Sequence, residues 1–240
     1  MNSCFNYLFH IVYIFVFVIG FTQGQNVTLK ENGIRTIYLI RHGFYDEADE
    51  RNDDVGKGLT SLGIAQAKLL SSRLKGITVK FTSLTSSTMT RARQTAMIIN
   101  EEFPHLQLQQ SQLISECTPP TWREDIMAET DSTALAECVA NLEKAFNEIF
   151  ITSPGEEDRN DIIVCHGNVI RYFVTKVLKV DTLSWLQMGI GNCSLTIIRI
   201  LPNGSMKLDA FSDMGHIPPN MQTVTGGDNS SKELIIPTNK

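Results

Sequence analysis

Short apolar runs rich in β-branched residues alternate along this chain with longer segments whose apolar residues recur every three or four positions. The clearest runs are residues 36–40 and, far downstream, residues 161–165. Runs this apolar are typical of strands covered on both faces of a sheet. Further strands are expected over residues 80–85, within 106–115, over 193–200 and over 206–212.

Helical spacing connects these runs. It predicts helices over residues 60–76, with Thr60 as the cap, over 92–103, from 131 or 132 to 149, and from 168 to about 178. Strands and helices therefore alternate for most of the chain. This order is typical of an α/β sandwich.

The first 29 residues differ from the rest, because they contain no charged side chain and residues 8–21 are almost wholly apolar. They predict either a signal peptide cut near Gln25 or an uncleaved membrane anchor, and the pattern leaves both open. We expect one folded domain over residues 30–219. Residues 220–240 are expected to form a disordered tail.

Composition narrows the function classes. The formal net charge of −5 over 240 residues argues against nucleic acid as a partner, because proteins that bind phosphate backbones are usually basic. The five cysteines show no paired spacing and no CxxC motif. Cys165 and Cys193 lie in apolar runs, where a free thiol behaves as a small hydrophobic side chain.

Both main strand runs end in a His-Gly pair. Arg41, His42 and Gly43 follow the first run, and His166 and Gly167 follow the second. In open α/β sheets the chemistry collects at the carboxyl ends of such strands. The two imidazoles are therefore expected to meet in one pocket.

Several neighbouring features indicate an anion rather than a metal. Arg91 lies in the first turn of a predicted helix, where the helix dipole disfavours a cation unless an anion balances it. Asn168 opens the helix after His166, and the backbone amides there favour phosphate. The histidines lack the HxH or HExxH spacing of metal sites, so no metal is expected.

The motifs, taken in order, resemble those of the histidine phosphatase superfamily, in its phosphoglycerate mutase-like branch. The matching segments are residues 39–43, 59–67, 87–95 with Arg91, the single Glu116, and 165–171. The resemblance extends over residues 36–219. It implies a three-layer α/β/α sandwich around a mostly parallel sheet, with no metal cofactor.

The resemblance also implies a mechanism, with which the residues agree. His42 attacks phosphorus and forms a phosphohistidine, while cationic and imidazole groups hold the phosphate oxygens. Glu116 protonates the leaving oxygen and then activates water. The expected catalytic residues are His42, Glu116 and His166, and the expected phosphate-binding residues are Arg41, Arg91 and Asn168.

Within the family, the likeness is greatest to mitochondrial serine/threonine-protein phosphatases. It implies hydrolysis of phosphoserine and phosphothreonine on proteins at a mitochondrial membrane, reached through the apolar leader if that is uncleaved, with an oligomer possible. The short segment between Glu116 and His166 favours hydrolysis over mutase activity. Two alternatives stay open: a broad-specificity phosphomonoesterase secreted after cleavage near Gln25, and a catalytically silent, membrane-anchored adaptor.

Overall fold

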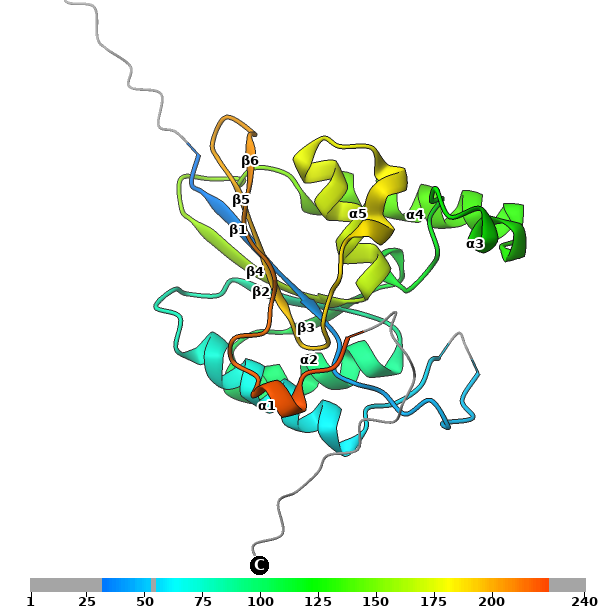
Figure 1. The fold of residues 1–240 in the computed structure, drawn as a ribbon. Helices are drawn as coiled ribbons and strands as arrows, with labels where there is room; N and C mark the ends of the chain where they lie inside the picture. The colour runs from blue at the N-terminus through cyan, green and yellow to red at the C-terminus, as the bar shows by residue number, and fades with distance from the viewer. Residues whose placement is uncertain (1–31, 53–54, 225–240) are drawn as a thin grey trace, which may run out of the picture. The chain divides into compact units, whose positions relative to one another are not determined.

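The computed structural model describes residues 32–52 and 55–224, whose strands form one six-stranded sheet in the order β3-β2-β4-β1-β5-β6 (Figure 1). The pairs β1–β4, β4–β2 and β2–β3 are parallel, and β5 is antiparallel to both β1 and β6. The prediction of a mostly parallel sheet is confirmed. The strands are β1 (Arg35–Arg41), β2 (Ser83–Ser87), β3 (Leu108–Ser111), β4 (Arg159–Cys165), β5 (Leu195–Ile200) and β6 (Met206–Asp213).

Helices cover both faces of this sheet, which confirms the three-layer arrangement. Alternate residues of β1 enter two separate cores, because successive side chains of a strand point to opposite faces. Tyr38 and Ile40 pack with α1 (Ser61–Lys75) and α2 (Thr90–Glu102), whereas Ile37 and Leu39 pack with α4 (Ser132–Ile149) and α5 (Gly167–Leu178). Figure 1 shows these two helix pairs on opposite sides of the sheet.

Two helices begin where the sequence predicts, and each has a side-chain cap. The Thr60 hydroxyl accepts a hydrogen bond from the Gly63 N–H, and α1 starts at the next residue, Ser61. The Asp131 carboxylate caps α4 in the same way. Each cap satisfies backbone N–H groups that have no partner within the helix.

The prediction of a strand over residues 80–85 was partly wrong. β2 starts at Ser83 and continues past residue 85 to include Ser86 and Ser87, while Met89 precedes α2 without a side-chain cap. Hydrogen bonds to β3 and β4 on both sides keep this polar segment in the sheet. The short helix α3 (Glu124–Glu129) and the 3-10 helices η1 (Gln112–Ile114), η2 (Thr182–Gln187) and η3 (Pro219–Met221) were not expected.

The folded domain continues past the predicted end at residue 219. Thr223 is buried, donates to the Asn192 amide oxygen and accepts from Gln66. These contacts hold the chain against the sheet as far as Val224, which pairs with Gly191. The predicted leader, residues 1–29, and tail residues 225–240 lie outside the described residues. Within residues 32–52 and 55–224, no helix is long and apolar enough to cross a membrane.

A disulfide bond joins Cys117 to Cys138, with 5.7 Å between the two Cα atoms. Cysteine spacing did not predict this pair, because the two residues are 21 positions apart and only the fold brings them together. Cys165 and Cys193 are buried free thiols, as their apolar surroundings predict.

Candidate active site

His42 and His166 lie side by side at the carboxyl ends of two neighbouring strands. Arg41 and Cys165 are paired in the parallel register of β1 and β4, so the residue after each strand emerges at the same edge. The His42 N–H donates to the Cys165 carbonyl at 3.0 Å, and the two imidazole centroids are 5.1 Å apart. The expected meeting of the two imidazoles is therefore observed.

Hydrogen bonds indicate the proton position on the His42 ring. Nδ1 lies 2.8 Å from the Gly43 carbonyl, which can only accept, so Nδ1 carries the proton. Nε2 accepts from Arg91 Nε at 3.1 Å. Burial, followed by the neighbouring His166 and the charges of Arg41 and Arg91, holds the pKa of His42 well below its usual value. The imidazole is therefore neutral at pH 7, and its Nε2 lone pair faces the cationic side of the site.

His166 precedes α5 and is fully buried. The Ser87 hydroxyl accepts from the Met89 N–H, so its own proton can go to His166 Nε2, which lies 2.8 Å away. His166 Nδ1 then carries a proton, and among the described residues it has no hydrogen-bond partner. Burial, with the charges of Arg91 and Arg41, lowers the pKa of His166 well below its usual value. The neutral ring thus presents an N–H donor to the site.

Arg41 and Arg91 make the site strongly positive. Both are buried, at 2% and 8% exposure, although burying a charge is costly unless it is balanced. Burial lowers the pKa of Arg41 to about 10, which leaves it charged at pH 7. Arg41 Nη1 donates to the Ile190 carbonyl at 2.7 Å, while its Nε has no partner within the described chain and lies beside Gly167 at the start of α5. This arrangement suits an anion.

Glu116 lies on the Nδ1 side of the His166 ring, and Ser87 lies on the Nε2 side. Its Oε1 accepts from the Asn168 backbone N–H at 3.2 Å, and its Oε2 is 3.9 Å from His166 Nδ1. Burial raises the pKa of Glu116 above its usual value, although the charges of Arg41 and Arg91 oppose the shift. With 26% of its side chain exposed, the carboxyl can exchange protons with solvent.

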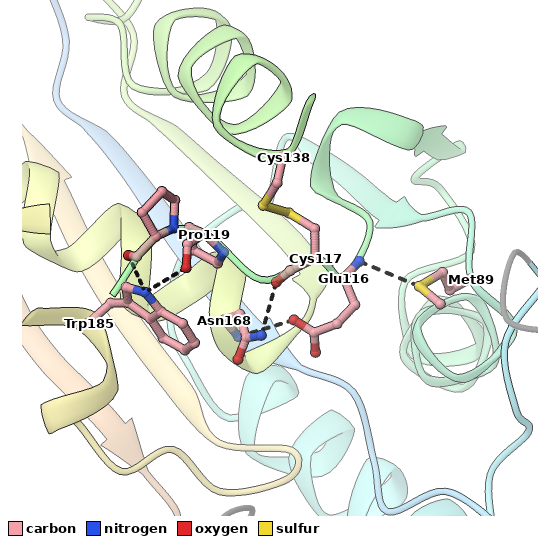
Figure 2. The surroundings of a disulfide bond; sticks show 8 residues. Met89, Glu116, Cys117, Pro119, Cys138, Asn168 and Trp185 are labelled. Atoms are coloured by element: carbon pink, nitrogen blue, oxygen red, sulfur yellow. Dashed lines mark hydrogen bonds between the residues drawn. A yellow bond between two sulfur atoms is a disulfide. The ribbon is translucent and has the colours of Figure 1, made fainter. Parts of the chain in front are cut away.

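Asn168, which we expected to bind phosphate, makes hydrogen bonds to other groups of the protein. Its side-chain Nδ2 donates to the Cys117 carbonyl at 2.9 Å (Figure 2), and its Oδ1 accepts from Arg171 at 2.6 Å. Its backbone N–H is engaged by Glu116. These contacts make Asn168 a residue that holds the segment carrying Glu116.

Four residues at the site were not singled out from the sequence. Ser87 bonds His166, and Asn192 Nδ2 donates to the His42 carbonyl at 3.1 Å. The Tyr45 ring lies 5.6 Å from the His42 ring and 5.1 Å from Arg91 Cζ, and Arg171 bonds Asn168. Ser87 and Arg171 lie within the matching segments 87–95 and 165–171, and Tyr45 follows the segment 39–43 closely, whereas Asn192 lies outside every matching segment. Ser87 is 79 residues from His166 along the chain, and Asn192 is 150 residues from His42, so local patterns do not reveal these contacts.

A metal ion is the competing occupant. His42, Glu116 and His166 each offer one ligand atom, and these atoms lie within 4.8 Å of one another. The guanidinium groups of Arg41 and Arg91 adjoin the same space and repel a cation. The charge at the site therefore favours a phosphate group over a metal ion.

Comparison with known proteins agrees with this geometry. The model of the histidine phosphatase superfamily (branch 1) matches residues 37–213. The mitochondrial serine/threonine-protein phosphatase Pgam5 of Caenorhabditis elegans is 41% identical over 206 residues, which are 82% of this chain and 69% of that protein. Human PGAM5, also named mitochondrial, is 33% identical over 81% of this chain and 68% of its own.

A solved structure has a similar fold. A phosphoglycerate mutase of Plasmodium falciparum aligns with a TM-score of 0.56 and 28% identity, covering 78% of this chain and 96% of that one. The predicted enzyme class, a phosphoric monoester hydrolase, and the predicted mitochondrial location are confirmed by the family and by the relatives' names. The chain belongs to branch 1 of the histidine phosphatase superfamily.

Proposed function

We propose that this protein is a metal-independent mitochondrial phosphatase that hydrolyses phosphoserine and phosphothreonine on proteins through a phosphohistidine on His42. The observation that carries the proposal is the state of His42, whose neutral ring is held at Nδ1 by Gly43 with Nε2 beside Arg91. The names of the relatives at 41% and 33% identity support the substrate class. Neither the secreted phosphomonoesterase nor the silent adaptor gains support from these relatives.

The first step transfers the phosphoryl group to the enzyme. His42 Nε2 attacks phosphorus, and the bond from phosphorus to the serine or threonine oxygen breaks. Arg41, Arg91 and the His166 N–H stabilise the charge on the non-bridging oxygens. Glu116, whose raised pKa favours the protonated carboxyl, gives its proton to the leaving oxygen.

The second step returns the enzyme to its starting state. The Glu116 carboxylate takes a proton from water, and the resulting nucleophile attacks the phosphohistidine. The bond from phosphorus to Nε2 breaks, inorganic phosphate leaves, and His42 is neutral again. The partly exposed Glu116 side chain can receive that water from solvent.

The test is to trap the intermediate. Wild-type protein and the variant His42→Asn are mixed with a ³²P-labelled phosphoserine peptide and quenched within milliseconds. We expect wild type to carry label that is acid-labile, base-stable and located on His42. The variant should carry none and should lose activity by on the order of 10⁴-fold, because the nucleophile is absent. An active wild-type preparation without labelled His42 would refute the mechanism.

A further inference from the structure

The segment that carries Glu116 is an irregular loop between η1 and α3, residues 115–123. No helix or strand fixes the backbone of this loop, so its side-chain and backbone contacts determine where the carboxyl lies. Figure 2 shows these contacts around Glu116. The Glu116 N–H donates to Met89 Sδ at 3.4 Å, and Trp185 Nε1 donates to the Pro120 carbonyl at 2.9 Å.

The strongest attachment is covalent and lies directly beside Glu116. Cys117 forms the disulfide with Cys138, which is buried in α4 and packs in the core shared with α5. The same α5 supplies Asn168, whose backbone holds the Glu116 carboxyl and whose side chain holds the Cys117 carbonyl. The disulfide thus ties the backbone beside the acid to the same helical layer that orients its carboxyl. Thioethers are weak acceptors, so the Met89 contact cannot replace this tie.

We propose that the Cys117–Cys138 disulfide positions Glu116 for proton transfer, and that its reduction by a dithiol selectively slows hydrolysis of esters with poor leaving groups. This rests on the proposed role of Glu116 as the acid. Cys117 and Cys138 are positioning residues, since neither touches the phosphate site. The bond is therefore a redox control on one step of the reaction.

The reduction is a two-electron exchange. A thiolate of the dithiol attacks Sγ of Cys117, the less buried of the two residues, and the bond to Cys138 Sγ breaks. Cys138 leaves as a thiolate and takes a proton. The second thiol of the reagent then displaces Cys117 as a thiol, so the dithiol is oxidised to its disulfide while the protein gains two thiols.

Selectivity follows from which groups the loop carries. His42 and Arg41 come from β1 and its end, Arg91 from α2, and His166 from the start of α5. Reduction leaves these elements in place and removes only the covalent attachment of the loop that carries the acid. A serine alkoxide needs a proton in order to leave, whereas p-nitrophenolate leaves without one. Loss of the acid should therefore affect phosphoserine far more than p-nitrophenyl phosphate.

The experiment compares oxidised and dithiothreitol-reduced full-length protein on a phosphoserine peptide and on p-nitrophenyl phosphate. Reduction should lower kcat for the peptide by about 10-fold or more, because misplacing a general acid removes part of the roughly 10²–10⁴-fold that it supplies, and leave kcat for the nitrophenyl ester within about twofold. Reoxidation should restore the peptide rate. The double variant C117S/C138S should show the reduced pattern under all conditions, and in Glu116→Gln the reductant should cause no further selective loss.

Equal losses on both substrates would overturn the proposal, because the disulfide would then serve only the fold. Unchanged rates after complete reduction, or free Cys117 and Cys138 thiols in the isolated active enzyme, would also overturn it. Labelling of His42 from p-nitrophenyl phosphate should persist in the reduced protein. If oxidised protein shows no such label, the proposed function itself has failed, whatever the disulfide does.

Discussion

Ser86 and Ser87 are neighbours at the end of β2, and both are fully buried. They differ in hydrogen bonding. Ser87 bonds His166 Nε2, whereas the Ser86 hydroxyl has no partner in the described part of the chain. A buried hydroxyl without a partner destabilises the fold, while one that fixes a catalytic ring serves the site.

We predict opposite results for the two alanine substitutions. Ser87→Ala should lower kcat/KM by about 5- to 10-fold, because His166 loses the bond that orients its ring and one such bond is worth about 1 kcal/mol. Ser86→Ala is the matched control. It should keep full activity and equal or exceed wild type in urea unfolding, because it removes an unsatisfied buried group. Equal activity losses in both variants would show that Ser87 acts only through packing.

Helix α1 controls the turn that presents His42. Its first turn approaches the chain after β1 so closely that a Cβ on Gly63 would overlap the Phe44 carbonyl, and one on Gly43 would lie 2.6 Å from the Gly63 carbonyl oxygen. The Thr60 N–H donates to the same Phe44 carbonyl at 3.0 Å, and the Phe44 N–H donates to Gln66 at 2.9 Å. The helix and the turn therefore move together.

Gly63→Ala should push the first turn of α1 away from the chain that follows β1. We expect a loss of about 1–3 kcal/mol in the free energy of unfolding, the usual effect of overpacking, together with a lower kcat, because the His42 turn shifts. Gly155→Ala is the control, since a Cβ there meets nothing within 4 Å. Chemical denaturation and steady-state kinetics measure both effects. A Gly63→Ala protein with wild-type stability and activity would contradict the close approach.

On the scale of the whole sheet, a buried ion pair that stabilises the fold lies toward one end of the strands, and the catalytic residues lie at the other end. Asp161 is fully buried in β4, five residues before His166. It accepts from Arg35 Nε at 2.7 Å and from Ser83 Oγ at 2.7 Å, and so joins β1, β4 and β2. Burial by itself raises the pKa of Asp161, but hydrogen bonds from Ser83 and Thr82 and the charge of Arg35 outweigh it and lower the pKa.

Asp161→Ala should destabilise the protein by about 3–5 kcal/mol, because it leaves Arg35 buried without its partner. The activity per folded molecule should stay near wild type. Since the folded pKa of Asp161 lies below the unfolded value of about 3.9, its contribution is complete above that pH and is lost as the pH falls. The difference between variant and wild type should therefore narrow in acid.

Asp209→Ala is the comparison, because Asp209 pairs with Arg199 on the solvent side, where a salt bridge is worth less than about 1 kcal/mol. Urea unfolding at pH 7 and below pH 4 measures both variants. Similar losses for Asp161→Ala and Asp209→Ala at pH 7 would contradict the assigned role of the buried pair.

Local patterns along the chain determined a large part of this protein. The apolar runs at residues 36–40 and 161–165, the cap at Thr60, the helix start at residue 131 or 132, and the His-Gly pairs after β1 and β4 were all predicted. These features depend on neighbours within a few residues, because burial follows the period of a strand or helix and a cap bonds within one turn. The ordered motifs also predicted the family that the comparisons confirm.

Contacts between distant residues were decided only by the tertiary structure. Pairing on both sides made a strand of Ser86 and Ser87, and packing against Gln66 and Asn192 extended the domain to Val224. The disulfide beside Glu116 forms because α4 packs against the loop of residues 115–123. The bond from the Asn168 side chain to the Cys117 carbonyl forms because α5 packs against the same loop. The amino-acid sequence placed the reactive groups at strand ends. The residues that hold Glu116 beside His166 are far apart along the chain, so local sequence patterns could not reveal their contacts.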